Sequence, residues 1–267
     1  MVDLTVSDVR SQGLSGRIYA SLGAGKTRAE GEAAPAFVLV HGIGVSHRYL
    51  FRLHQFLAET TDTYSIDLPG FGATPKPGRQ LSVGDYADFI LAALDELGVT
   101  SCVLVGHSMG TQFAVEAATR QPDRITELVL MGPVVDPRRR TVMRQALDLA
   151  TDCALFESPS SNLVVLTDYV RCGPRWYLKE LPVMMTYPLE ERIRDVGVPV
   201  LVLRGAKDPV ASRDWCQILA ARAAAGEFRE VPGCGHVVQH TGTAEVAGAI
   251  LDFARCPGRP LERETTA

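Results

Sequence analysis

Short apolar segments alternate with longer segments of helical periodicity along most of this chain. Parallel strands that are covered on both faces read as apolar runs rich in branched residues, so the short segments predict buried strands. They are residues 37–40, 64–66, 102–105, 128–131, 200–203 and 228–231. The segments with helical spacing are residues 49–59, 83–97, 109–120, 213–225 and 244–255. The alternation predicts an α/β fold, with a mostly parallel central sheet and helices on both of its faces.

One predicted helix carries a signal at each end. Ser82 stands before its first apolar position and Asp85 follows three residues later, which is the spacing of a side-chain cap at a helix N-terminus. Gly98 follows the last apolar position and is typical of a helix stop. The two signals predict a helix over residues 83–97.

The segment 133–198 breaks the alternation. It lacks a convincing strand, shows helical spacing at residues 141–150 and carries scattered prolines. A loop of this length is rare inside a compact domain, so we expect an insertion with helices of its own. The prediction is a core domain of residues 1–132 and 199–267, with a small helical cap of residues 133–198 inserted before the penultimate strands.

Composition and charge narrow the class of protein. Of the 267 residues, 46% are hydrophobic and 22% are charged, which is typical of a globular domain. The net charge of −4 comes from mixed signs, which argues against a nucleic-acid partner. No apolar run approaches the roughly 20 residues of a membrane-spanning helix, and the first residues do not resemble a signal peptide. We therefore expect a cytoplasmic protein with a small-molecule substrate and no membrane partner, of open oligomeric state.

Cysteines and charged clusters give no sign of a metal or a cofactor. The six cysteines are widely scattered without a Cys-x-x-Cys pair, which argues against a zinc site and favours reduced thiols. No cluster of histidines and carboxylates has metal-ligand spacing. The one basic run, residues 138–140, predicts a solvated helix start. We expect neither a metal nor a cofactor.

The strongest chemical signal is a Gly-x-Ser-x-Gly motif centred on Ser108. It lies between a predicted strand and a predicted helix, the setting in which a nucleophilic serine occupies a sharp turn. Gly106 and Gly110 remove the side chains that would collide with the neighbouring strand and helix. Ser108 is therefore the predicted nucleophile. The amide of Met109, at the start of a helix, is placed to donate a hydrogen bond to an oxyanion.

With this motif the chain resembles the α/β-hydrolase superfamily, in particular its small bacterial esterase-like members with a helical cap. Residues 38–44 resemble the oxyanion loop of that family, which follows an early strand. Residues 67–72 resemble the next strand-end turn and are expected to have a structural role. In the family the amide after His-Gly is the second oxyanion donor, which implies Ile43.

Six histidines compete for the role of the general base that a serine nucleophile needs within about 3 Å. His236 lies in a Gly-Cys-Gly-His segment directly after the last predicted strand, and it gives the order serine, acid, histidine that the fold uses. The rival, His240, is expected to begin a polar surface. The other four are expected to be structural: His47 and His54 as solvated or capping residues, His41 as a buried brace of the oxyanion loop, and His107 pointing away from the partner of the serine.

The acid that orients the histidine has two candidates. Asp208 follows the penultimate predicted strand, and its Gly-x-x-Asp spacing from Gly205 resembles the acid loop of the family. Asp136, near the end of the strand at residues 128–131, is the alternative position. Motif and chain order both favour Asp208.

The resemblance implies a serine hydrolase that cleaves a carboxylic ester through an acyl-enzyme intermediate. Apolar residues near the motifs and in the cap predict a small to medium, partly hydrophobic substrate. The predicted substrate-binding residues are Trp176, Met184, Met185 and Val237. For each cap residue, packing of the cap onto the body is the competing interpretation.

Other functions stay open, among them a perhydrolase or thioesterase activity. A C–C bond hydrolase of the meta-cleavage product type uses the same triad in similar capped folds, although Val237 stands where that resemblance expects a tryptophan. A non-catalytic ligand-binding protein can also use this scaffold, because a fold does not determine a function.

Overall fold

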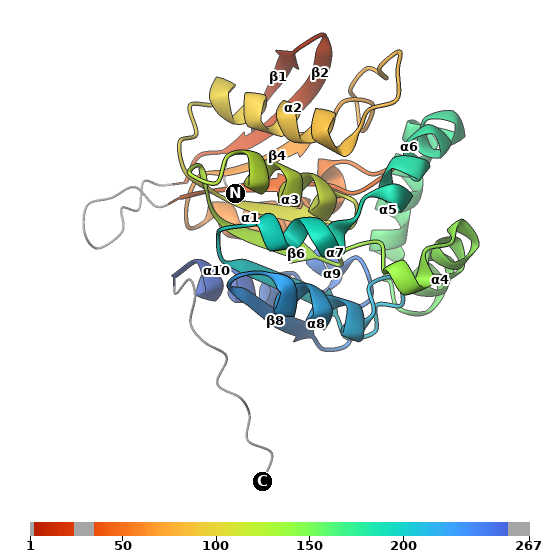
Figure 1. Cartoon of the computed structure of the whole chain (residues 1–267). Coiled ribbons are helices and arrows are strands. Elements are labelled where there is room, and N and C mark those ends of the chain that lie inside the picture. Colours follow the sequence, from red (N-terminus) through yellow and green to blue (C-terminus); the bar gives the residue numbers. More distant parts are fainter. Residues whose placement is uncertain (1–2, 24–34, 256–267) are drawn as a thin grey trace.

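Eight strands form the central sheet of the computed structural model, which describes residues 3–23 and 35–255 (Figure 1). Residues 1–2, 24–34 and 256–267 of the predicted core domain lie outside the described residues. The strand order is β1-β2-β4-β3-β5-β6-β7-β8. The strands are β1 (Thr5–Ser11), β2 (Leu14–Ser21), β3 (Ala36–Val40), β4 (Thr63–Asp67), β5 (Cys102–His107), β6 (Ile125–Met131), β7 (Val200–Gly205) and β8 (Gly226–Val231).

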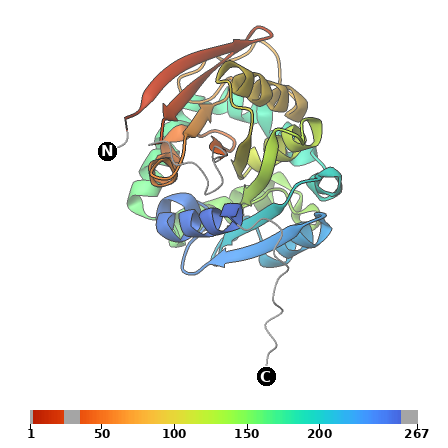
Figure 2. The ribbon, with the colours of Figure 1, turned by 90° about the vertical axis from the view of Figure 1, so that its left-hand side faces the viewer.

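Strand direction confirms the predicted fold class. β3 pairs in parallel with β4 and β5, and the pairs from β5 to β8 are parallel as well. β1 and β2 form an antiparallel hairpin at one edge, and β2 is also antiparallel to β4. Figure 2 shows this hairpin and β8 at opposite edges of the sheet. The apolar runs do not include the hairpin, because β1 buries little besides Val9 and so has no continuous apolar stretch.

Helices cover both faces of the sheet, so successive strand residues pack into different cores. α1 (Phe51–Ala58) and α10 (Thr243–Arg255) cover one face. α2 (Val83–Glu96), α3 (Gly110–Arg120) and α8 (Arg213–Arg222) cover the other. On β3, Phe37 and Leu39 pack with α1 and α10, whereas Val38 and Val40 pack with α2 and α3. This is the alternation that a strand buried on both faces produces.

Helix α2 has the ends that its sequence predicts. The Ser82 hydroxyl accepts a hydrogen bond from Asp85 N, and the Asp85 carboxylate accepts one from Ser82 N, so the two residues form a capping box. After the helix, Gly98 takes a φ of 65°, which favours glycine because it carries no Cβ. Local signals therefore set both ends of this element.

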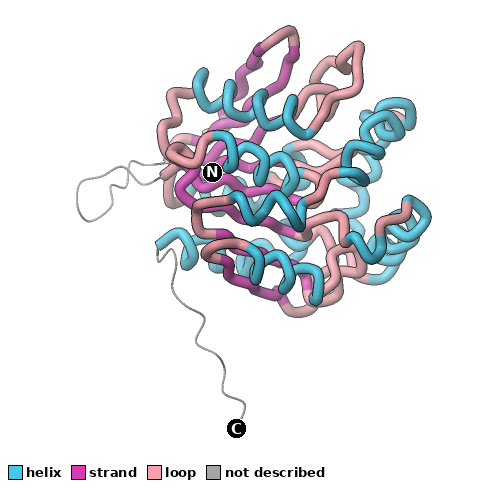
Figure 3. The backbone as a smooth tube through the Cα atoms, in the orientation of Figure 1, coloured by secondary structure: helices cyan, strands magenta, loops and turns pink. Residues whose placement is uncertain are grey.

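The segment 133–198, predicted as a cap, contains no strand in the structure. Its helices are α4 (Val142–Leu155), α5 (Pro159–Cys172), α6 (Pro174–Thr186) and α7 (Leu189–Arg192), with 3-10 turns at Pro137–Arg139 and Ile193–Asp195. Helices α4 to α6 gather at one end of the molecule, on the right of Figures 1 and 3. α7 instead packs against α3 and α8 of the body.

The basic run at residues 138–140 lies in a short 3-10 turn, and Arg138 is exposed, as a solvated helix start predicts. All three arginines also form ion pairs: Arg138 with Asp136, Arg139 with Asp148 and Arg140 with Glu190. Charge spacing along the sequence could not reveal Glu190 as a partner, because it meets Arg140 only in the folded chain.

Candidate active site

The Gly-x-Ser-x-Gly motif forms the sharp turn between β5 and α3. Ser108 has a φ of 53°, in a region that residues other than glycine rarely adopt. A Cβ on Gly110 would lie 2.5 Å from the carbonyl oxygen of Val40, and one on Gly106 would collide with the backbone of Gly110. The two glycines therefore allow the strained turn that presents the Ser108 side chain at the carboxyl end of the sheet.

His236 and Asp208 form a buried pair at the same end of the sheet. Nδ1 of His236 lies 2.8 Å from Oδ2 of Asp208, and because a carboxylate accepts, Nδ1 is the donor. The other carboxylate oxygen accepts hydrogen bonds from the amides of Val210 and Ala211 at 2.8 and 3.0 Å. Asp136, the alternative acid, pairs with Arg138 instead. The geometry thus brings Asp208 to His236 and leaves Asp136 elsewhere.

The pair strongly perturbs the acid–base properties of both groups. Burial lowers the pKa of His236, but the charge of Asp208 and its hydrogen bond outweigh burial and raise the pKa to about 9. Burial raises the pKa of Asp208, yet the charge and hydrogen bond of His236 hold it below the usual range. The imidazole is therefore a stronger base than an isolated histidine.

Ser108 and His236 both line one cavity of about 250 Å³ beneath the cap helices. In the part of the chain that the structure describes, the Ser108 hydroxyl makes no hydrogen bond within 3.5 Å. Such contacts often tighten only when substrate binds. The chemistry would therefore need a small approach of the Ser108 hydroxyl to the imidazole.

Two backbone amides in segments that adjoin this nucleophile have their hydrogen-bonding capacity unused. Among the described residues, neither the Ile43 nor the Met109 amide donates to another protein group. The loop of Ile43 lies against the nucleophile, since a Cβ on Gly42 would lie 2.9 Å from Cβ of Ser108. Unused amides beside a nucleophile are what an oxyanion hole requires. The arrangement can hold the negative oxygen of a tetrahedral intermediate.

A chain of hydrogen bonds links the oxyanion loop to the histidine loop. Gly42 N donates to the Tyr49 hydroxyl at 2.8 Å, and that hydroxyl lies 2.8 Å from Nδ1 of His107. Nε2 of His107 lies 2.9 Å from the carbonyl oxygen of His236, so Nε2 is the donor and Nδ1 accepts from Tyr49. Burial, followed by the charge of His236, lowers the pKa of His107 to about 3, in agreement with a neutral ring.

Two carboxylates from the cap hold the backbone of the histidine loop. Asp152 Oδ1 accepts from the His236 amide and Glu157 Oε1 from the Val237 amide, both at 2.8 Å. Gly235 carries no Cβ where one would meet both carboxylates. Burial raises the pKa of Asp152 to about 6, and burial together with the charge of Asp152 raises that of Glu157 to about 7. Sequence reasoning missed both residues, because no motif marks them.

The predicted substrate-binding residues divide into two groups. Met184 and Val237 line the cavity, as does Ile43. Trp176 and Met185 do not line it. The indole of Trp176 lies beside Gly70, with its ring 6.4 Å from that of Phe71, and Met185 is buried in the core. The remaining cavity wall is mostly apolar and includes the cap residues Gln145, Leu149, Cys153, Tyr169, Tyr177, Leu178 and Leu181.

Position on α6 explains part of this division. The α6 residues that line the cavity are Tyr177, Leu178, Leu181 and Met184, which share one broad side of the helix. Trp176 lies on the other side. Met185 follows Leu181 by four residues and so lies on the same side, but it is near the end of the helix and is buried in the core. An apolar residue in the cap sequence carries no sign of which side it occupies, so the prediction included both groups.

Four other histidines take structural places. His41 donates from Nδ1 to the Gly42 carbonyl and accepts from the Leu68 amide at Nε2, as expected for a brace of the oxyanion loop. His47 pairs with Asp67 at 3.0 Å. His54, expected to be solvated or capping, is buried and contacts Ser65, and burial lowers its pKa to about 4. His240, expected to begin a polar surface, is buried next to Ser160.

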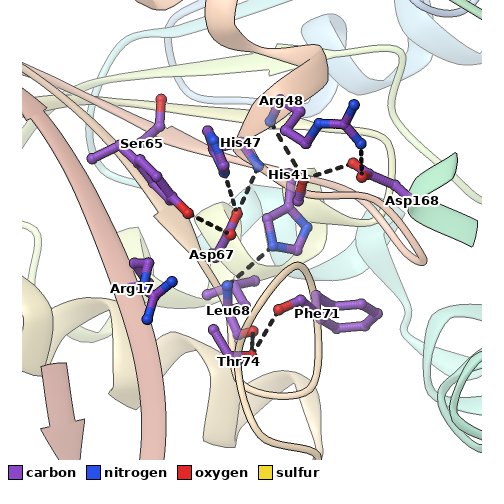
Figure 4. A network of polar contacts seen from close by, with 12 residues as sticks. Arg17, His41, His47, Arg48, Ser65, Asp67, Leu68, Phe71, Thr74 and Asp168 are labelled. Carbon is purple, nitrogen blue, oxygen red and sulfur yellow. Dashed lines mark hydrogen bonds and ion pairs between the residues drawn. The ribbon is translucent and has the colours of Figure 1, made fainter. Parts of the chain in front are cut away.

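Figure 4 shows how the oxyanion loop is anchored on both sides. On the body side, Asp67 accepts hydrogen bonds from the backbone and the ring of His47. On the cap side, Asp168 of α5 pairs with Arg48 at 2.8 Å and accepts from the Ser46 hydroxyl at 2.6 Å. The loop that carries Ile43 is thus fixed to the sheet and to the cap.

The described part of the chain contains neither a metal-binding cluster nor a membrane-spanning helix. No group of three or more histidine, cysteine, aspartate or glutamate residues in residues 3–23 and 35–255 could hold a metal ion. Over the same ranges, no helix has the length and apolar character to cross a bilayer.

Comparison with known proteins identifies relatives of the chain. A 2-(acetamidomethylene)succinate hydrolase of Mesorhizobium japonicum is 26% identical over 253 residues, which cover 83% of this chain and 88% of that protein. The acetyltransferase component of an acetoin cleaving system of Pseudomonas putida is 29% identical over 249 residues, or 84% of this chain. The chain spans only 65% of the length of that second relative.

A solved structure and a family model agree with these relatives. The enol-lactonase of Burkholderia xenovorans shares the fold with a TM-score of 0.79 at 19% identity, over 94% of this chain and 100% of the other. The model of the alpha/beta hydrolase family matches residues 37–249. Because this match covers most of the sequence, the chain belongs to the alpha/beta hydrolase family.

Proposed function

We propose that the protein is a serine esterase in which Ser108 is the nucleophile, His236 the general base and Asp208 the acid that orients it. One observation carries the proposal. A buried His236–Asp208 pair and a serine held in a strained turn line the same cavity. The unused amides of Ile43 and Met109 support it as donors to the oxyanion.

The reaction proceeds in two stages. In the first, the Ser108 proton passes to Nε2 of His236 while the serine oxygen bonds to the ester carbonyl carbon, and the Ile43 and Met109 amides hold the negative oxygen. The bond to the leaving oxygen then breaks as His236 protonates the alcohol. In the second stage, water gives its proton to His236 and attacks the acyl-enzyme, which releases the carboxylic acid and restores Ser108.

The cavity supports a small to medium substrate with a hydrophobic part. Its wall is mostly apolar, and Met184 and Val237 contribute to it from the cap and from the histidine loop. A small-molecule ester fits this chemistry better than a macromolecule, because the cavity lies beneath the cap helices.

The described cysteines, residues 102, 153, 172, 216 and 234, are free thiols, which favours a cytoplasmic location.

Hydrolysis of short p-nitrophenyl esters tests the proposal, with Ser108→Ala as the inactive control. We expect turnover by the wild type and a loss of about a thousandfold or more in the variant. Unchanged turnover in Ser108→Ala would refute the mechanism. A dienone ring-cleavage product, assayed in parallel, tests the carbon–carbon alternative, which faster cleavage of the dienone than of any ester would favour.

The two candidate acids form a matched pair of variants. Asp208→Asn leaves His236 without a carboxylate at Nδ1, and we expect kcat to fall about 10⁴-fold. Asp136→Asn changes a carboxylate that pairs with Arg138, and we expect turnover close to the wild-type value. A severe loss in the Asp136 variant alone would assign the acid to Asp136 instead.

A further inference from the structure

The cap helices expose an unusual number of large apolar side chains. Met143 is 81% exposed, Val170 74% and Leu155 68%. The full set, which we call the cap face, is Val142, Met143, Leu147, Leu155, Leu163, Leu166, Val170 and Leu178. All eight lie on α4, α5 or α6, at the end of the molecule where these helices gather (Figure 1). Apolar surface concentrated in this way marks an interaction site.

Helix α4 is amphipathic, but it buries polar side chains and exposes apolar ones. Its buried residues are Gln145, Asp148 and Asp152, whereas Met143 and Leu147 are exposed. A helix that only covers a protein body buries its apolar side and exposes its polar side. Here the buried side chains are polar, and the apolar side chains of Met143 and Leu147 face solvent.

Each buried carboxylate has a specific partner. Asp148 pairs with Arg139 and Arg144, both within the cap segment, whereas Asp152 accepts from the His236 amide and Asp168 of α5 pairs with Arg48. These polar contacts fix the orientation of α4 and α5. The exposure of their apolar sides is therefore a consequence of how the cap is attached, not of loose packing.

The exposed charges of helices α4 to α6 are all positive. Between residues 142 and 186 the acids are Asp148, Asp152, Glu157, Asp168 and Glu180, and none of them is exposed. The exposed charged residues of this segment are Arg144, Arg171 and Arg175. The whole chain has a net charge of −4, so the cap surface differs in sign from the molecule as a whole.

We propose that the cap face docks on a lipid surface that carries anionic head groups. Apolar side chains on helices inserted at the level of the head groups, with arginines beside them, have the chemistry of a peripheral membrane contact. A second copy of this chain fits less well. A twofold contact would bring the arginines of two cap faces together with no exposed carboxylate to neutralise them.

The cavity opens onto the same face. Val142 and Leu178 line the cavity and are also exposed, at 49% and 62%. A lipid layer on the cap face would therefore place apolar molecules at the entrance of the cavity. The sequence expectation of no membrane partner rested on the lack of a spanning segment, and docking of this kind requires none.

Co-sedimentation of the full chain with vesicles tests the proposal. We expect binding to phosphatidylcholine vesicles that contain phosphatidylglycerol, weaker binding to phosphatidylcholine alone, and weakening by salt. The variant Met143→Ser/Leu166→Ser/Val170→Ser should lower the partition coefficient about tenfold or more. A matched control, Val6→Ser/Phe56→Ser, alters exposed apolar residues outside the cap and should bind like the wild type.

Three further measurements separate the possible outcomes. The triple variant should retain turnover of a soluble short ester, since none of its three substituted residues lines the cavity. Ser108→Ala should bind vesicles normally. Loss of docking and loss of catalysis can therefore be told apart. Absence of wild-type binding to either vesicle, or full binding by the triple variant, would overturn the proposal. So would a dimer in light scattering that the triple substitution converts to monomer, because the cap face would then belong to a second copy.

Discussion

At the scale of single residues, three different partners hold His236. Asp208 accepts a hydrogen bond from the ring at Nδ1, Asp152 accepts one from the backbone amide, and His107 donates one to the carbonyl oxygen. Asp152 and Glu157 also act through charge, since both contribute to the raised pKa of His236. They are positioning residues, because they contact the loop and not the reacting atoms.

The base must be neutral to accept the Ser108 proton, so ester turnover should rise as the pH increases from neutral toward about 9, the raised pKa of His236. Asp152→Asn/Glu157→Gln removes two negative charges but keeps an oxygen for each backbone amide. Its pH–rate profile should therefore shift to lower pH, with little loss at the optimum. The measurement is kcat/KM for a p-nitrophenyl ester against pH, with the Ser108→Ala rate subtracted.

A second variant separates the effect of the Asp152 charge from the effect of its hydrogen bond to the His236 amide. Asp152→Ala removes the acceptor for the His236 amide as well as the charge, so turnover should fall at every pH. If the pH–rate profile of the double variant matches that of the wild type, the two carboxylates do not raise the pKa of His236, and their role is limited to holding the loop.

Tyr49 is a second residue whose role only the contacts reveal. Tyr49→Phe leaves the Gly42 amide and Nδ1 of His107 without a buried partner, which should lower the free energy of unfolding by about 1–3 kcal/mol. Because Gly42 adjoins Ile43, kcat should fall more than KM changes. Urea denaturation and steady-state kinetics check this, and Tyr64→Phe is the control, since the Tyr64 hydroxyl makes no hydrogen bond among the described residues. Equal effects of both substitutions would contradict it.

At the scale of elements, the place of a residue on α6 decides whether it meets substrate. Met184 lines the cavity and its neighbour Met185 does not, although both side chains are buried. The two methionines are chemically identical, so any difference between their variants reports position alone.

Met184→Ala enlarges the cavity and should raise the ratio of kcat/KM for a long-chain over a short-chain p-nitrophenyl ester by about tenfold. Met185→Ala leaves a void in the core, so the unfolding free energy should fall by about 2–5 kcal/mol while the ratio stays constant. Steady-state assays on a series of acyl chain lengths, with denaturation curves for both variants, give the measurements. The reverse pattern would mean that Met185, and not Met184, lines the cavity.

At the scale of the whole molecule, parallel topology assembles the site. Ile43, Ser108, Asp208 and His236 come from four distant segments, and each lies in a turn or loop after β3, β5, β7 or β8. The carboxyl ends of parallel strands meet at one edge, so these loops converge there. The cap then closes over them, and its inward carboxylates leave the apolar cap face outside.

The sequence by itself determined most of the body and the centre of the site. Buried strands, the ends of α2 and the turn at Ser108 follow from local rules of periodicity, capping and steric room, which act within a few residues. The prediction that Asp208 would meet His236 also rested on chain order in a parallel sheet. Local chemistry and simple topology were enough for these features.

Only the tertiary structure decided the rest. The edge hairpin β1–β2, the burial of His54 and His240, the side of α6 that faces the cavity and the contact of Asp152 with His236 all depend on partners far away in the chain. The local sequence around a side chain does not identify its packing or hydrogen-bonding partner. Its place is settled only when packing and hydrogen bonding are satisfied together across the whole fold.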